Sequence, residues 1–409
     1  MIFSKLPTDG YILFGTRVIR MFAYGFLSVV LVLYLAQLGL SEGLIGLLLS
    51  LTLIGDAAIS LWMTTTADRI GRRRILIAGA GLMLLAGVLF AVTDRVTLLL
   101  VAAIIGVISP SGYEVGPFLP VEQAALSQIV PDRTRTEVFA WYNLVGSFAT
   151  AIGALCGGVL TEVLQQVGVI PLNSYRAVLI LYGVMGVILA AVFTQLSPRV
   201  EAVHSDGPQT LTRFGLHRSR SIVLKLSTLF GLDAFAGGLV VQSLVAYWFH
   251  VRFGVEPAVL GGIFFGANIL AGISALTAAW VAARIGLVNT MVFTHLPSNV
   301  LLMLVPLMPN LPLAIAVLFA RFSISQMDVP ARQSYTMAVV APDERSAAAG
   351  ITGIARSIGA AISPTIAGAC FSNPSLLGAP FLLAGALKVI YDVLLYRGFR
   401  ARRTTAQDQ

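Results

Sequence analysis

Long apolar runs separated by short polar loops fill almost the whole chain. A helix needs roughly 20 apolar residues to cross a hydrocarbon core about 30 Å thick, and twelve runs come near or exceed this length. We therefore predict twelve transmembrane helices, at residues 12–39, 43–66, 75–93, 97–119, 138–160, 176–196, 222–250, 258–282, 287–308, 311–331, 346–371 and 376–396.

The second half of the chain resembles the first. Leu119–Gln123 recurs as Val329–Gln333 at a shift of 210, and each copy is followed by a Pro-Asp pair. In the first predicted helix of each half, residues align at a shift of 213: Phe22 with Phe235, Gly25 with Gly238, Tyr34 with Tyr247. Parallel repeats of this kind typically hold a solute site near the midplane between the halves.

The repeat predicts how the chain is organised. The fold class is an all-α polytopic membrane protein with two pseudo-symmetric six-helix bundles. We expect an N-terminal bundle at 1–196, a cytoplasmic linker at 197–221, a C-terminal bundle at 222–397 and a cytoplasmic tail at 398–409.

Composition supports the membrane assignment. Charged residues make up 11% of the chain, hydrophobic residues 57%, and the mean hydropathy is +0.87. The net charge of +8 comes from arginines in alternate loops, which predicts a lipid bilayer rather than nucleic acid as the partner. By the positive-inside rule, both termini are cytoplasmic in an inner or plasma membrane.

A basic loop follows the second predicted helix and reads Ala67–Arg74, with an Asp-Arg-x-Gly-Arg-Arg core. This loop resembles the signature of the major facilitator superfamily, whose members transport solutes. The resemblance implies a conformational latch, a charge contact that opens and closes during transport, formed by Asp68, Arg69, Gly71, Arg72 and Glu122. The alternative is that these arginines only set the topology.

The fifth predicted helix carries small residues where antiporters of that family carry a Gly-rich signature. The register reads Ala149, Gly153, Ala154, Gly157 and Gly158, and its repeat begins at Gly359. Small residues at this spacing also serve plain helix packing in lipid. Export is therefore favoured over import, and packing is the competing explanation.

Charged side chains inside the apolar runs are costly there and are functional candidates. Arg17, Arg20 and Tyr24 share one face of the first predicted helix. Asp233 occupies the repeat position of Arg20, so we predict an Arg20–Asp233 pair across a central cavity. Such a pair breaks when a proton or solute competes, which makes Asp233 the leading proton-coupling candidate.

Other intramembrane charges extend these predictions. Glu114 lies among Pro110, Gly112, Gly116 and Pro117, where the backbone is expected to break, and Asp56 has no basic residue at helical spacing. Both are further proton-coupling candidates. The candidates for the solute cavity are Arg20, Tyr24, Arg321, Asp328 and Arg356. We interpret Lys388 either as a local pair with Asp392 or as a snorkelling lysine, and His295 as isolated, so no metal site is predicted.

Together these patterns predict a secondary transporter, not an enzyme, that exports a small organic solute by proton antiport and works as a monomer without a cofactor. No nucleotide-binding fingerprint occurs in the sequence. The alternatives are a proton-coupled uptake symporter for a small organic anion and a non-transporting membrane sensor on the same fold.

Overall fold

The computed structural model describes residues 6–201, 218–341 and 344–399, and within these ranges every regular element is helical. The chain divides into two compact units. Unit 1 comprises Met1–Ser205 and Val241–Asn268, and unit 2 comprises Asp206–Val240 and Ile269–Gln409. Most of the predicted linker, 202–217, and most of the tail, 400–409, lie outside the described residues.

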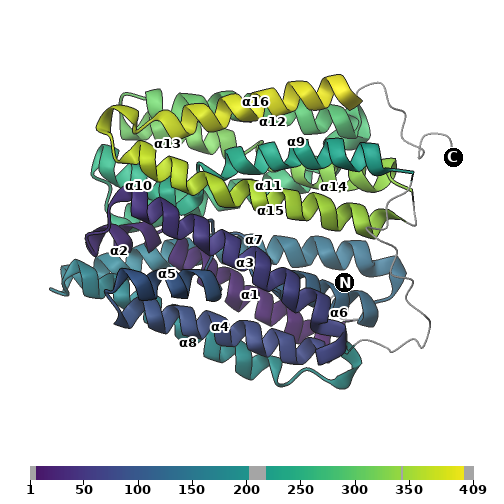
Figure 1. Cartoon of the computed structure of the whole chain (residues 1–409), viewed down its shortest axis with the longest axis horizontal. Coiled ribbons are helices and arrows are strands. Elements are labelled where there is room, and N and C mark those ends of the chain that lie inside the picture. Colours follow the sequence, from purple (N-terminus) through teal and green to yellow (C-terminus); the bar gives the residue numbers. More distant parts are fainter. Residues whose placement is uncertain (1–5, 202–217, 342–343, 400–409) are drawn as a thin grey trace. The chain divides into compact units, whose positions relative to one another are not determined.

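Unit 1 is built from the first eight helices, α10 and the start of α11 (Figure 1). Its helices are α1 (Thr8–Ser28), α2 (Leu31–Gln37), α3 (Glu42–Ile70), α4 (Arg72–Val92), α5 (Val96–Ile105), α6 (Phe118–Ile129), α7 (Asp132–Gln166), α8 (Pro171–Phe193), α10 (Gln242–Phe253) and α11 (Pro257–Ile285). Helix α1 packs along α7, and α4 packs along α8.

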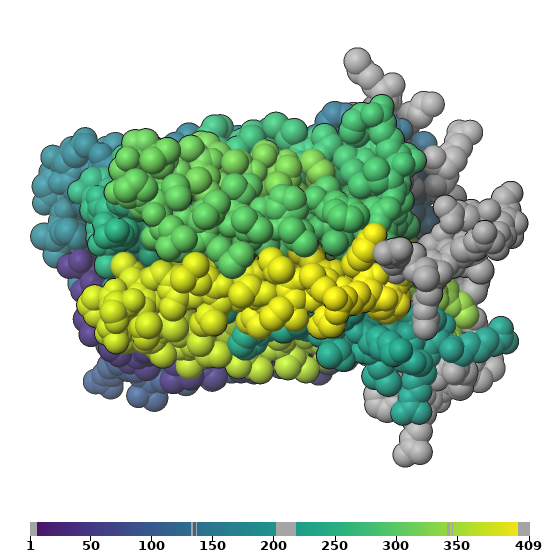
Figure 2. Space-filling model, turned by 90° about the horizontal axis from the view of Figure 1, so that it is seen from above, coloured from purple at the N-terminus to yellow at the C-terminus, as the bar shows by residue number. Residues whose placement is uncertain are grey.

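Unit 2 takes the remaining helices and the end of α11. They are α9 (Arg220–Gly238), α12 (Leu287–Leu304), α13 (Leu311–Phe322), α14 (Asp328–Val339), α15 (Arg345–Phe371) and α16 (Ala379–Phe399). Helix α9 packs along α15, and α12 along α16. Figure 2 shows α16 as a yellow band at the surface. Most of its exposed side chains are apolar, as a lipid-facing helix requires, among them Leu382, Leu383, Ile390, Val393 and Leu394.

The described helices account for the twelve predicted crossings. Nine spans are long and apolar enough to cross a membrane, and α9 with α10 forms one of them. Helices α1 and α2 form a further span bent by 40°. The two remaining predictions, 97–119 and 311–331, each became a short apolar helix followed by a break and a second helix.

The break between α5 and α6 follows from its sequence, as predicted. Gly112 and Gly116 adopt positive φ angles of 70° and 78°, which favour glycine. Pro117 precedes α6 and cannot donate a backbone hydrogen bond. The twelve residues 106–117 therefore leave the helical path, and their backbone groups are available to side chains.

Glycines bring the first helix pair of each unit into backbone contact. In unit 1, a Cβ on Gly25 would overlap Thr150 of α7, and one on Gly153 would overlap Phe22 of α1. In unit 2, a Cβ on Gly359 of α15 would overlap the Gly231 carbonyl of α9. The small residues noted in the fifth predicted helix thus have a packing role.

Candidate functional site

Arg20 and Glu122 form a buried two-point ion pair between α1 and α6 of unit 1. Arg20 Nη1 donates to Glu122 Oε1 at 2.8 Å, and Nη2 donates to Oε2 at 2.7 Å. Both side chains are completely buried. Bidentate geometry gives the strongest guanidinium–carboxylate contact, and an unpaired buried charge is very costly. The pair therefore joins the two helices firmly.

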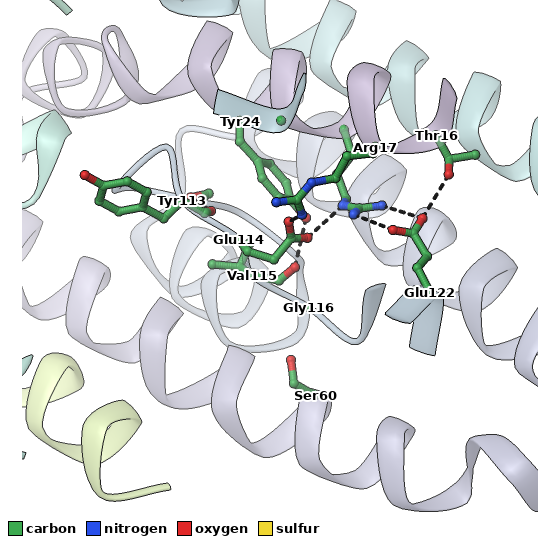
Figure 3. A network of polar contacts seen from close by, with 12 residues as sticks. Thr16, Arg17, Tyr24, Ser60, Tyr113, Glu114, Val115, Gly116 and Glu122 are labelled. Carbon is green, nitrogen blue, oxygen red and sulfur yellow. Dashed lines mark hydrogen bonds and ion pairs between the residues drawn. The ribbon is translucent and has the colours of Figure 1, made fainter. Parts of the chain in front are cut away.

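The break between α5 and α6 carries Glu114 to the same face of α1 (Figure 3). Arg20 Nε donates to Glu114 Oε1 at 2.7 Å, and Arg17 pairs with the other carboxylate oxygen. Tyr24 donates its hydroxyl to the Val115 carbonyl at 3.0 Å. The α1 face predicted from spacing therefore binds the break and its carboxylate.

Two further side chains complete the coordination of Glu122. Thr16 donates to Oε1 at 2.9 Å, and the Tyr142 hydroxyl of α7 donates to Oε2. The Arg17 guanidinium lies 4.9 Å from the Tyr142 ring centroid and fills the space beside Gly146. We name this set the Glu122 cluster: Thr16, Arg17, Arg20, Glu114, Glu122 and Tyr142. Its two arginines balance its two carboxylates.

Asp56 holds the opposite side of the break. Its Oδ1 accepts the backbone N–H of Gly116 at 2.6 Å and the Ser60 hydroxyl at 3.3 Å. These contacts give Asp56 a local structural explanation, because a carboxylate can satisfy the free backbone donors of a broken helix. Its predicted role in proton coupling stays a prediction.

Unit 2 contains a second buried cluster, centred on Asp233 of α9. Lys388 Nζ of α16 lies 2.5 Å from Asp233 Oδ1, and Arg332 Nη1 of α14 lies 2.9 Å from Oδ2. Arg356 of α15 approaches Oδ2 at 3.3 Å. Three cations from three helices therefore share one carboxylate.

The Asp233 contacts continue into a second set of polar side chains. His295 of α12 places Nε2 3.8 Å from Asp233 Oδ1 and Nδ1 2.9 Å from Asp392 Oδ1. Asn299 donates to Asp392 Oδ2 at 2.9 Å, and Asp328 lies 3.2 Å from Arg332. We name this set the Asp233 cluster: Asp233, His295, Asn299, Asp328, Arg332, Arg356, Lys388 and Asp392.

Of the remaining candidates for the solute cavity, Arg321 lies in the last turn of α13, and its guanidinium carbon is 4.9 Å from the ring centroid of Phe322. Asp328 and Arg356, by contrast, both belong to the Asp233 cluster. The structure therefore brings two of the three predicted unit 2 residues together.

At the loop between α3 and α4, Arg72 Nε donates to Asp68 Oδ1 at 2.8 Å, while Arg69 is exposed and Gly71 has a φ of 109°. The remaining partners differ from the prediction. Glu201 accepts the backbone N–H of Arg72 at 2.6 Å, at the N-terminus of α4, where a carboxylate is favourable. Glu122 pairs with Arg20 in this structure, so its assignment to the latch stays a prediction.

The predicted Arg20–Asp233 pair stays a prediction: Arg20 has ion-pair partners within unit 1, and Asp233 has ion-pair partners within unit 2. Two predictions within unit 2 need correction. Lys388 pairs with Asp233 rather than with Asp392. His295 is not isolated, since both ring nitrogens face carboxylates.

A signal for Lys388 and His295 was present in the sequence. His295 and Asn299 are four residues apart in one apolar helix, and Lys388 and Asp392 are four apart in another. Each pair shares a helix face. Polar faces of this kind are costly in lipid, so they are expected to pack against each other. The spacing alone could not show that α12 and α16 are neighbours.

This architecture defines a class: a polytopic helical membrane protein whose spans enclose balanced ion clusters. Residues 13–364 match the family model described as the Major Facilitator Superfamily. The chain belongs to this superfamily of transporters, as the basic loop predicted.

Known proteins resemble the chain over nearly its full length. It is 30% identical to the uncharacterized membrane protein YJR124C of Saccharomyces cerevisiae, covering 96% of this chain and 94% of that protein. It is 24% identical to the quinolone resistance protein NorA of Staphylococcus aureus, covering 90% and 92%. A solved bacterial homolog of the human lysosomal transporter Spinster shares the fold, with a TM-score of 0.73, 15% identity and coverage of 98% and 97%.

Proposed function

We propose that the chain is a proton-coupled secondary transporter that exports a small organic solute by alternating access, with the Asp233 cluster as its coupling site. Membership of the superfamily supports solute transport. The observation that carries the coupling proposal is the sharing of buried Asp233 by Lys388, Arg332 and Arg356.

The physical reason is the cost of an unpaired charge in a low-dielectric interior. A buried carboxylate that loses its cations does not remain ionised alone: a proton binds to it or to a neighbouring group that can replace the lost cation. The helices that carry the three cations are separate, so a movement of one helix changes the charge balance at Asp233. A conformational change and a protonation change are thereby coupled.

The outward direction is supported by the similarity to NorA, which is named for quinolone resistance. We also propose that both termini are cytoplasmic and that the protein lies in an inner or plasma membrane. Arg72, Arg73 and Arg74 at the start of α4, together with Arg397 near the end of α16, support this orientation.

The test is proton movement in everted membrane vesicles carrying an acid-inside gradient. The solutes are a quinolone, tetraphenylphosphonium, a sugar and benzoate, and a pH-sensitive dye reports the gradient. At least one solute should discharge the gradient with the wild type but not with Asp233→Asn. Asp94→Asn is the matched control, because Asp94 pairs with Arg176 in an exposed position. Discharge by Asp233→Asn equal to the wild type would overturn the assignment.

The exposure and the weak contact of Arg356 favour a second candidate function, a proton-coupled uptake symporter for a small organic anion. Its side chain is 37% exposed, and its contact with Asp233 is the longest of the three cation contacts. A solute carboxylate could replace Asp233 at this guanidinium. In right-side-out vesicles, benzoate would then carry protons inward, and Arg356→Gln would abolish that movement. Export by antiport predicts proton movement opposite to that of the solute.

A further inference from the structure

The imidazole of His295 lies between two carboxylates in the interior of unit 2. Nδ1 is 2.9 Å from Asp392 Oδ1, and Nε2 is 3.8 Å from Asp233 Oδ1. His295 is 5% exposed and Asp392 is fully buried. With Asp392 ionised, its oxygen can only accept a hydrogen bond, so Nδ1 carries the hydrogen and donates to Asp392. The amide nitrogen of Asn299 also lies 3.2 Å from Nδ1.

This tautomer leaves an unshared electron pair at the other ring nitrogen. In the neutral imidazole, Nε2 carries no hydrogen and faces the negatively charged Oδ1 of Asp233. Protonation converts Nε2 into a donor directed at that oxygen. In this position the charged imidazolium can pair with Asp233 when that carboxylate has lost one of its other cations.

Charge counting shows when that need arises. The charged groups of the cluster around the ring come from four helices: Asp233 from α9, Asp328 and Arg332 from α14, Arg356 from α15, and Lys388 and Asp392 from α16. Tyr391 of α16 also faces the ring, with its centroid at 5.8 Å. The described cluster thus has three cations and three carboxylates when the imidazole is neutral.

Lys388 and the imidazole face the same oxygen of Asp233. Lys388 Nζ lies 2.5 Å from Oδ1, and His295 Nε2 lies 3.8 Å from it. Removing the ammonium leaves two cations against three carboxylates in a buried site, and a proton on Nε2 restores the balance. The ammonium and the imidazolium are therefore alternative partners of one carboxylate oxygen.

We propose that His295 is the proton-binding residue of the Asp233 cluster, and that it takes up a proton at Nε2 when Lys388 withdraws from Asp233. This inference rests on the proposed coupling at Asp233 and specifies which atom holds the proton. In the bound state the proton stays on the ring, so Asp233 and Asp392 both remain carboxylates.

The experiment counts protons and needs no solute. Purified full-length protein in detergent is titrated from pH 8.5 to pH 5, and proton uptake per chain is measured. Lys388→Met should take up about one more proton than the wild type, because the lost ammonium is replaced by a proton on His295. The double variant Lys388→Met with His295→Asn should lose this additional uptake.

A matched histidine provides the control. His250 of α10 contacts a backbone carbonyl, that of Val255, through Nδ1. In a His250→Asn background, Lys388→Met should still add about one proton, since the cluster is unchanged. Lys388→Gln repeats the comparison with a polar side chain, and a size-exclusion profile confirms that each variant is folded.

The outcomes separate this inference from the proposed function. Additional uptake that survives His295→Asn would assign the proton to another group, such as Asp233, and overturn the inference while leaving proton coupling intact. The absence of additional uptake in both Lys388 variants would also overturn it. A failure of coupling itself appears only in the vesicle experiment with Asp233→Asn.

Discussion

The two buried clusters occupy corresponding positions in the sequence repeat, but the signs of the paired residues are exchanged. Arg20 of α1 corresponds to Asp233 of α9 at a shift of 213, and Glu122 of α6 corresponds to Arg332 of α14 at a shift of 210. Both units connect these positions by an ion pair. The repeat therefore preserves the pairing of the helices while the charges are exchanged.

The clusters differ in how the carboxylate is held. Glu122 receives two bonds from Arg20 and one each from Thr16 and Tyr142, so both oxygens are saturated by neighbours that act together. Asp233 is shared by three cations on separate helices. Losing one partner leaves two in place, which makes the unit 2 cluster the adjustable one.

A single position adds to this contrast. Gly146 of α7 makes room for the Arg17 guanidinium, and at a shift of 210 its repeat partner is Arg356 of α15. In unit 1 the additional cation, Arg17, is carried by α1 and is buried. In unit 2 it is Arg356, which is carried by α15, the counterpart of α7, and its side chain is 37% exposed. The exchange moves a charge from the interior of a cluster toward its edge.

The largest effect is expected from Glu122→Gln. The change leaves Arg20 buried without its bidentate partner, and breaking such a pair costs roughly 3–5 kcal/mol. Thermal unfolding in detergent measures the loss, with exposed Glu137→Gln of α7 as the control. Equal unfolding midpoints for the two variants would show that Glu122 does not hold the unit together.

Substituting the contact glycines should give a smaller effect that is similar in both units. Gly153→Val and Gly359→Val each force side-chain atoms into the backbone of a neighbouring helix, at about 1–3 kcal/mol or more. Gly81→Val of α4 is the control, because a Cβ there has open space. Strong destabilisation by only one of the two substitutions would show that the two units differ in helix packing as well as in their charged residues.

Within unit 2, Arg356→Gln should cost much less than Arg332→Gln. The Arg356 side chain is 37% exposed and makes the longest of the three cation contacts with Asp233, so its loss is expected to cost about 0–1 kcal/mol. Arg332 is buried and contacts both Asp233 and Asp328, so its loss is expected at roughly 3 kcal/mol. Similar unfolding midpoints would contradict the view that Asp233 has one dispensable cation.

The smallest change in stability should follow Asp68→Asn. The Asp68 side chain is 64% exposed, and i,i+4 pairs of this type contribute about 0.3–0.5 kcal/mol. A latch would still make this substitution slow transport severalfold without altering the unfolding midpoint. Transport at the wild-type rate would favour the simpler interpretation of the loop as a topology determinant.

Sequence patterns predicted the helices and the break at 106–117, because apolar length and the Gly and Pro positions act locally. They also predicted the shared face of Arg17, Arg20 and Tyr24. The partners of Arg20 and Asp233 were missed, since a repeat gives corresponding depth but not which neighbour a long side chain reaches. Lys388 and His295 meet Asp233 only through the packing of α16 against α9 and of α12 against α16.

The assignment of Val241–Asn268 to unit 1 means that the polypeptide passes between the units three times, after residues 205, 240 and 268. A protease cut in the central hydrophilic segment would therefore sever one of three covalent connections. The resulting C-terminal fragment would still supply α10 to the fold of unit 1. If the two halves of this chain are expressed separately, the N-terminal half is thus expected to require the C-terminal half, which carries α10, in order to complete the fold of unit 1.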